Sequence, residues 1–146
     1  MSDHPSIRLP ISHDLQRIRD LVAGYAARLG LPPDRVTDLV LATNEAVTNV
    51  LEHGGGSGTV ILTADDAQLT VDITDSAGRL TSHHLAAARI KPALAPRGFG
   101  LWLIHRLCDH VHLDHPRGQS RLRLALHLPT SQQTRTRPRH SALADA

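Results

Sequence analysis

The sequence is poor in cysteine and in aromatic residues, and it has no long hydrophobic run. The single cysteine, Cys108, excludes an internal disulfide and any metal site built from several thiolates. The amino-terminal segment has no basic stretch leading into an apolar one, and nowhere do about 18 apolar residues follow one another, so we expect neither a secretion signal nor a membrane-spanning helix. These absences favour a cytoplasmic protein.

Only 2% of the residues are aromatic while 40% are hydrophobic, so the core must be built from Leu, Val, Ile and Ala. A chain of 146 residues fits one domain, and at that length folding buries roughly 68–70% of the unfolded surface without needing a disulfide. We place this domain at residues 1–129. Residues 130–146 are polar, contain proline and show no period, which predicts a disordered tail.

The net positive charge of the chain comes from that tail. Its three arginines, set against one aspartate, account for the whole formal net charge of +2, so the rest of the chain is formally neutral. A neutral body without a basic face or interleaved aromatic side chains argues against nucleic-acid binding.

Apolar residues recur every three or four positions in three stretches, which is the spacing of an amphipathic helix. The first stretch follows Ser12, a reasonable N-cap. The second begins at Pro33, a residue suited to the first helical turn, and ends at the glycine triplet 54–56. The predicted helices cover about 14–29, 33–53 and 99–109.

Elsewhere the period is two, which predicts strands, and the polar turns DDAQ and PRGQ each separate two alternating stretches of a β-hairpin. Between the hairpins, residues 76–98 show no clear period, so we expect a long loop with one short helical turn near 82–90. The order of elements predicts a two-layer α/β sandwich whose mostly antiparallel sheet is covered on one face by helices. The predicted strands cover 7–11, 59–64, 69–75, 111–115 and 120–128.

Helix 33–53 carries a polar row among its apolar residues. Glu45, Asn49 and His53 lie four residues apart, so they fall on one side of the helix. A carboxylate and a carboxamide one turn apart can polarise a hydroxyl and offer oxygen ligands to Mg²⁺. The same spacing is expected of a helix face exposed to solvent, so the spacing alone does not distinguish a binding site from a solvated surface.

A second candidate lies in the segment DITDSAGR. Its alternating strand ends in Asp75, followed by Ser76, Ala77 and Gly78. A carboxylate where a strand meets a loop can accept a hydrogen bond from an exocyclic amine, and small neighbours allow a flat ring to come close. Taken alone, Asp75 can equally be a turn residue.

The third candidate is RGFGLWLI, with Gly98 and Gly100 at the start of the third helix. Glycines there expose backbone N–H groups, and the helix N-terminus adds a partial positive charge, so an anion such as a phosphate is favoured. Arg97 can add a charged contact. A flexible hinge is the competing interpretation.

A helix with Glu-x-x-x-Asn, a strand ending in Asp, a loop, Gly-x-Gly opening a helix and a closing hairpin together resemble the Bergerat-fold ATPases. This is the superfamily of gyrase, Hsp90, histidine kinases and DNA mismatch repair proteins. Within it, the chain resembles the compact bacterial branch of anti-sigma-factor serine kinases and their stand-alone regulatory relatives. The stretches LATNEAVTNVLEHG and RGFGLWLIHRLCDHV carry the resemblance, which covers about residues 7–128.

The resemblance implies a role for individual residues. Asn49 stands where the family ligates the Mg²⁺ that bridges the ATP phosphates, and Glu45 stands where catalytic members have their general base. Asp75 matches the adenine-reading carboxylate, residues 79–97 match the ATP lid, and Ser120 stands where the family often has Thr near the adenine. The implied nucleotide-binding residues are Asn49, His53, Asp75, Gly78, Arg97, Gly98, Phe99, Gly100, Leu101 and Ser120.

The chain departs from the family at the first glycine box, which usually reads Asp-x-Gly-x-Gly. Ala77 and Arg79 hold its glycine positions, with Gly78 between them. The change to arginine is the larger one, because it can alter how the backbone turns beneath the adenine.

The function implied is a protein-serine kinase that passes the γ-phosphoryl group of Mg-ATP to a Ser of a partner regulator. The implied partners are a sigma factor, an anti-sigma-factor antagonist or both, and relatives often form homodimers. Two alternatives stay open: a non-catalytic module that uses ATP to hold a partner, and a nucleotide-free scaffold.

Histidine is abundant, with eleven residues in the chain. His110, His112 and His115 are close in sequence, but an alternating strand containing the first two offers at most two ligands on one face. No cysteine or carboxylate pattern completes a zinc set, so we expect no metal site other than the one for Mg²⁺.

Overall fold

The computed structural model describes residues 4–79 and 99–129. The predicted helical turn near 82–90 and the predicted tail lie outside this range. None of the described helices combines the length and the apolar character needed to cross a membrane. The described elements are β1 (Ile7–Pro10), α1 (Leu15–Arg28), α2 (Pro33–His53), β2 (Gly58–Ala64), β3 (Gln68–Asp75), α4 (Phe99–Leu107), β4 (His110–Asp114), the 3-10 turn η1 (Pro116–Gly118) and β5 (Ser120–His127).

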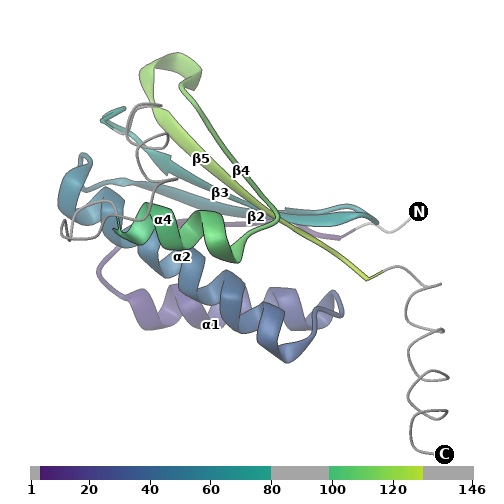
Figure 1. The fold of residues 1–146 in the computed structure, drawn as a ribbon. Helices are drawn as coiled ribbons and strands as arrows, with labels where there is room; N and C mark the ends of the chain where they lie inside the picture. Colours follow the sequence, from purple (N-terminus) through teal and green to yellow (C-terminus); the bar gives the residue numbers. More distant parts are fainter. Residues whose placement is uncertain (1–3, 80–98, 130–146) are drawn as a thin grey trace, which may run out of the picture.

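The strands form one antiparallel sheet in the order β1-β2-β3-β5-β4. Helices α1, α2 and α4 lie together on one face of it (Figure 1). The predicted two-layer α/β sandwich is therefore confirmed. Within the second hairpin the longer strand, β5, takes the inner position and pairs on both sides, which leaves β4 at the edge of the sheet.

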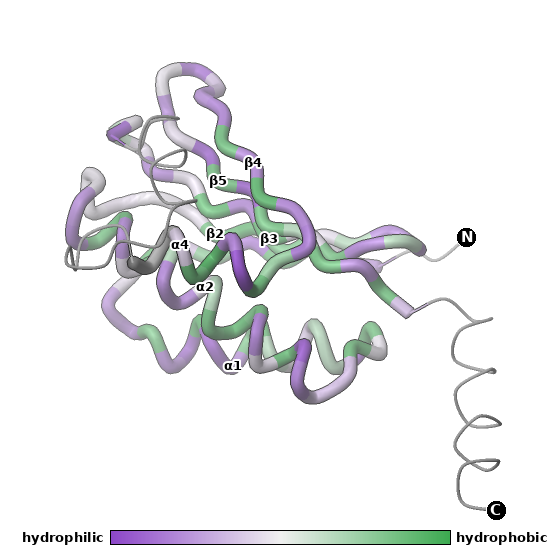
Figure 2. The backbone as a smooth tube through the Cα atoms, viewed as in Figure 1, coloured by the Kyte–Doolittle hydropathy of each residue, from purple (hydrophilic) through white to green (hydrophobic). Residues whose placement is uncertain are grey.

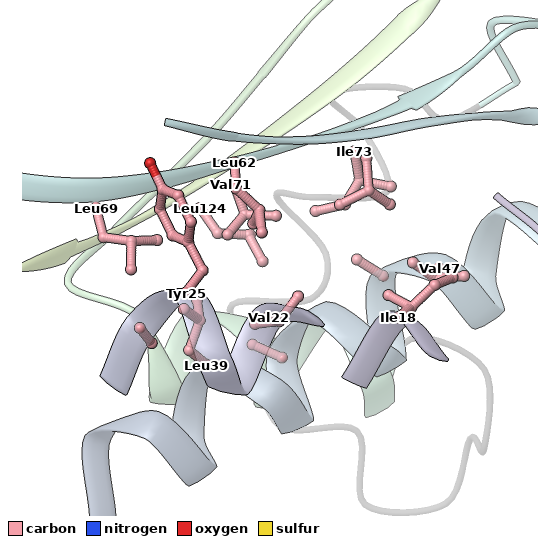
Figure 3. Close-up of a cluster of buried hydrophobic side chains, with 14 of the residues drawn as sticks. Ile18, Val22, Tyr25, Leu39, Val47, Leu62, Leu69, Val71, Ile73 and Leu124 are labelled. Atoms are coloured by element: carbon pink, nitrogen blue, oxygen red, sulfur yellow. The ribbon is translucent and has the colours of Figure 1, made fainter. Parts of the chain in front are cut away.

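The core lies between the helices and the sheet, where side chains of α1 and α2 point toward those of β2, β3 and β5 (Figure 3). Burying one such side chain contributes about 1.5–3 kcal/mol, so this layer supplies most of the driving force for folding. Apart from Tyr25, the side chains labelled in Figure 3 are aliphatic, as the low aromatic content predicts: Ile18, Val22, Leu39, Val47, Leu62, Leu69, Val71, Ile73 and Leu124.

Tyr25 is the aromatic residue of this core. Its ring is buried, and its hydroxyl makes no hydrogen bond with any described residue. Burial raises the pKa of the phenol, and the nearby charge of Arg28 opposes that shift only in part.

The opposite face of the sheet is polar, and the alternation that produces it is visible along the strands in Figure 2. Arg123 on β5 donates to both oxygens of Asp72 on β3, at 2.7 and 2.9 Å. Arg121 donates in the same two-pronged manner to Asp114 on β4. These pairs join the inner strand β5 to each of its neighbours.

The N-cap of α1 and the end of α4 each lie two residues from the position that the sequence predicts. Asp14 caps α1 in place of Ser12, because its carboxylate accepts a backbone N–H of the first turn at 3.2 Å while the serine hydroxyl accepts the N–H of Asp14. The third helix ends at Leu107 instead of residue 109. It stops there because the N–H of Asp109 donates to the carbonyl of Ala125 on β5 at 3.0 Å, which draws the chain into the sheet.

Candidate nucleotide site

Helix α2 turns its predicted polar row toward the side that carries α4. Near the start of α2, Arg35 donates to the carbonyl of Leu107 at the end of α4, at 3.1 Å. Asn49 follows Arg35 by fourteen residues, which is about four helical turns, so both lie on the same side of α2. Ala42 and Ala46 between them are fully buried, and their small side chains let α4 pack against α2.

The three polar residues predicted on α2 differ in their surroundings. Glu45 and Asn49 are half-buried, whereas His53 is exposed, with its Nε2 3.8 Å from Oε2 of Glu52. The side-chain amide nitrogen of Asn49 is buried and makes no hydrogen bond with any described residue. Leaving a buried polar group unsatisfied costs about 1–3 kcal/mol, so such a group in a folded protein needs an explanation, of which a bound ligand is one.

Asp75 ends β3 with a fully buried carboxylate. Its Oδ1 accepts the N–H groups of Gly55 at 3.0 Å and Ala77 at 3.1 Å, and its Oδ2 accepts the N–H of Arg79 at 2.8 Å. A carboxylate has about four acceptor positions. Oδ2 therefore keeps capacity for one further donor, which is what the exocyclic amine of adenine offers.

Glycines let three separate backbone segments close around Asp75. A Cβ on Gly54 would come 2.8 Å from Oδ2 of Asp75, and one on Gly55 would come 2.3 Å from the side chain of the turn after β3. Gly78 has a φ of +68°, and a Cβ there would come 2.1 Å from the carbonyl oxygen of Gly118. The end of α2, the turn after β3 and the turn before β5 meet only because these positions carry no side chain.

Ser120 lies beside Asp75 in the sheet. It opens β5 directly opposite Asp75 and is fully buried. Gly58, the first residue of β2, lies opposite Asp75 on the other side. Because side chains alternate along a strand, Asp75 shares the helix-covered face with Ile73, so the carboxylate points toward the helix layer.

The altered first glycine box keeps an ordinary backbone. Within residues 4–79 and 99–129, Arg117 is the only residue other than glycine with a positive φ. Ala77 and Arg79 therefore adopt conformations open to any L-residue. The side chain of Arg79 is exposed while its N–H binds Asp75, so the turn forms without backbone strain despite the arginine.

Helix α4 begins at Phe99, where the sequence predicts that the Gly-x-Gly segment opens a helix. Arg97 and Gly98 lie outside the described residues, and so do the side chains of residues 99–101. The described part of the site is thus α2, the end of β3, the glycine triplet and the start of β5.

The predicted site residues do not include Gly54 and Gly55, which the sequence spacing marks only as a helix stop. The N–H of Gly55 donates to the carboxylate of Asp75, and a side chain on Gly54 would collide with it. The feature of the sequence that could have revealed them is the run of three glycines at 54–56. One glycine suffices to end a helix, whereas three in succession indicate that backbone approaches closely.

A five-stranded antiparallel sheet covered on one face by three helices is the Bergerat-type fold. The family model of the histidine kinase-like ATPase domain matches residues 12–126, so the chain belongs to that family.

Curated relatives carry regulatory and kinase names. The anti-sigma F factor of Clostridium acetobutylicum is 26% identical over 108 residues, which is 69% of this chain and 76% of the relative. The serine-protein kinase RsbW of Bacillus cereus is 27% identical over 115 residues, covering 70% of this chain and 71% of the relative.

Two solved structures share the fold. One contains the RsbU and RsbW domains of a Mycobacterium tuberculosis protein, with a TM-score of 0.63 and 18% identity over 86% of this chain. The match spans 33% of that longer chain. The other is the SiaB–SiaC complex from Pseudomonas aeruginosa, with a TM-score of 0.60 and 20% identity over 84% of this chain and 88% of that one.

Proposed function

We propose that this chain binds Mg-ATP between α2, the end of β3 and the start of α4, and transfers the γ-phosphoryl group to a serine of a partner regulator. Membership of an ATPase-domain family implies that the site takes ATP. Relatives named anti-sigma factor and serine-protein kinase support a regulatory role of this kind. The single observation that carries the proposal is the buried amide of Asn49, which no described residue satisfies.

The adenine end of the site is set by Asp75. Its Oδ2 has capacity for one donor, and Gly54 and Gly55 place no side chain against it. Adenine presents an amine at the position where guanine presents a carbonyl oxygen. A carboxylate held by three backbone N–H groups attracts the first and repels the second, so ATP is selected over GTP.

The residues on α2 fit a magnesium ion held jointly with the nucleotide. The donor available is the carboxamide oxygen of Asn49, one turn after the proposed base Glu45, and Mg²⁺ prefers such oxygen ligands together with phosphate oxygens and water. Turning the carboxamide by a half rotation exchanges its oxygen and nitrogen, so Asn49 can present either one. When bound, the ion supplies charge neutralisation on the phosphates.

Glu45 is placed to act as the base. It is half-buried and makes no hydrogen bond or ion pair with the described residues, so its carboxylate is available to a substrate. It accepts the hydroxyl proton of the substrate serine as that oxygen forms a bond to the γ-phosphorus, while the bond to the β–γ bridging oxygen breaks and ADP leaves.

The partner in this proposal is a regulatory protein, namely a sigma factor, an anti-sigma-factor antagonist or both. The chain is similar in fold to one chain of the SiaB–SiaC complex, and this supports the proposal that it binds a protein partner. A non-catalytic module that holds its partner only when ATP is bound is the second candidate, favoured by Ala77 and Arg79 in the first glycine box. A homodimer and a cytoplasmic location stay predictions.

One experiment separates these functions. The protein is incubated with γ-labelled ATP, Mg²⁺ and a candidate antagonist that carries a target serine, and ATP binding is followed in parallel by calorimetry. The kinase proposal expects label on the antagonist, loss of label but not of binding in Glu45→Gln, and loss of both in Asn49→Ala. ATP-dependent capture of the partner without label supports the binding module, and absence of binding at millimolar ATP supports the scaffold.

A further inference from the structure

A pair of histidines lies on the polar face of the sheet, away from the candidate nucleotide site. His110 opens the edge strand β4 opposite Ala125, and His127 ends β5 two residues further along the same face. Their Nε2 atoms approach to 3.2 Å, with the rings edge to face and their centroids 5.1 Å apart. Both residues are exposed, so the space around the two nitrogens is open to solvent.

The separation of the two nitrogens matches the spacing that a metal ion imposes. Two imidazole nitrogens bound at about 2.0–2.1 Å to one tetrahedral Zn²⁺ lie roughly 3.3–3.4 Å apart. The 3.2 Å between Nε2 of His110 and Nε2 of His127 differs from that separation by about 0.2 Å or less. The antiparallel β4–β5 ladder holds the two residues in this register.

Asp109 places a carboxylate near one of the two rings. Its Oδ2 lies 3.8 Å from Nδ1 of His127 and also accepts the backbone N–H of His127 at 2.8 Å and Nη2 of Arg35 at 3.1 Å. A carboxylate held beside Nδ1 favours the tautomer with the proton on Nδ1, which leaves the lone pair on Nε2. Around bound zinc, the ring nitrogen that does not bind the metal usually donates to a carboxylate; here the two atoms lie 3.8 Å apart, so that hydrogen bond would form only on a small approach of the ring.

We propose that His110 and His127 chelate a divalent transition-metal ion of the zinc class, with Asp109 orienting His127. Within residues 4–79 and 99–129, no group of three or more histidine, cysteine or acidic side chains is placed to hold a metal. The protein therefore supplies two ligands, and water fills the remaining positions. The bound ion ties the edge strand β4 to β5. The sequence prediction of no second metal site weighed His110 only with His112 and His115 and did not consider a partner on another strand.

A hydrogen bond from Nε2–H of one ring to Nε2 of the other is the competing account of the same contact. It needs a proton between the two nitrogens and no metal. The two accounts differ in the protonation of Nε2, which nitrogen-detected NMR of the imidazoles reads directly.

The test is a titration of the full chain with Zn²⁺ alone, with no nucleotide present, followed by ¹⁵N NMR of the imidazoles and by thermal melting. The proposal expects one equivalent of Zn²⁺ to shift the Nε2 resonances of His110 and His127 together and to raise the melting temperature. His110→Ala and His127→Ala each lower Zn²⁺ affinity at least tenfold and abolish the rise. Asp109→Asn lowers affinity about tenfold, the lower end of the range for a second-shell partner.

The matched control is His112→Ala. His112 is an exposed histidine on the same strand and face as His110, but the residue opposite it on β5 is Arg123. The Zn²⁺ affinity of this variant stays within twofold of wild type. The proposal is overturned if the two Nε2 resonances do not move with Zn²⁺, if they report only a shared proton, or if the two histidine variants bind as tightly as the control. Circular dichroism of each variant checks that the fold is intact.

Discussion

Asp75, the last residue of β3, lies directly opposite Ser120, the first residue of β5, and both are fully buried on the helix-covered face. The residue opposite Asp75 on β2 is Gly58. The carboxylate therefore lies where the ends of three strands meet the end of α2, and its three hydrogen bonds come from two different turns. In the proposed function, nucleotide binding and local stability depend on the same group.

Replacing Asp75 should therefore cost both stability and binding. In Asp75→Asn the side chain loses its charge and turns an amide donor toward one of the three backbone N–H groups. Losing a hydrogen bond to a charged group costs about 1.5–3 kcal/mol, so we expect the urea midpoint to fall accordingly. The control is Asp114→Asn, which breaks a partly exposed ion pair and costs at most about 1 kcal/mol. Equal losses in the two variants would contradict this role of Asp75.

Replacing Asn49 should reduce nucleotide binding without reducing stability. Asn49→Ala removes a buried amide that no described residue satisfies, and alanine favours the helix, so the free protein keeps or gains stability. We expect affinity for Mg-ATP to fall at least tenfold. Asn44→Ala is the control, because it loses a 2.9 Å bond from Arg19 on the α1 side, costs about 0.5–1.5 kcal/mol and leaves affinity unchanged. Denaturation and calorimetry on the same samples measure both quantities, and a large stability loss in Asn49→Ala would count against a ligand-directed amide.

The glycines give a steric prediction. Gly55→Ala places a methyl group where its Cβ would meet another side chain at 2.3 Å, so the turn after β3 must move, at a cost of about 1–3 kcal/mol and of nucleotide affinity. Gly24→Ala lies inside α1 with its nearest atom at 3.6 Å, and it should stabilise the protein by about 0.5–1 kcal/mol. Thermal melting with and without ATP compares them. If Gly55→Ala is as stable as Gly24→Ala, the close approach is wrong.

The ion pair between Asp114 and Arg121 predicts a dependence of stability on pH. Hydrogen bonds from the guanidinium hold the pKa of Asp114 below its usual value. A carboxyl whose pKa is lowered on folding stabilises the protein above its unfolded pKa of about 3.9, and the contribution disappears as the pH falls through the folded value. Wild type and Asp114→Asn should differ in urea midpoint by a constant amount above about pH 5 and converge below pH 4. A gap that persists at pH 2 would contradict this account.

Much of the fold follows from local spacing. The bounds of α2 and of the hairpin β2–β3 agree with the prediction within one residue, because the apolar period and the breaking residues act over short stretches. The end of α4 does not agree, since it depends on the bond that Asp109 makes to Ala125 of β5, a partner sixteen residues away.

The candidate site likewise has features that the sequence predicts and contacts that it does not. The placement of Asn49 and Glu45 on one side of a helix, and of Asp75 at the end of a strand, follows from the order of residues. The contact between Asp75 and Gly55 does not, because twenty residues separate them and only the packing of α2 on the sheet brings them together. The roles of the predicted site residues stay predictions that the variants above can test.

By itself, the sequence determined the type of each element, the face that each element buries and the polar residues available for chemistry, because these depend on period and spacing along the chain. The tertiary structure alone decided which of those residues meet. The order β3-β5-β4 sets Asp75 against Ser120 and His110 against His127. Strand order depends on how whole elements pack against one another, so it cannot be read from any single stretch of residues.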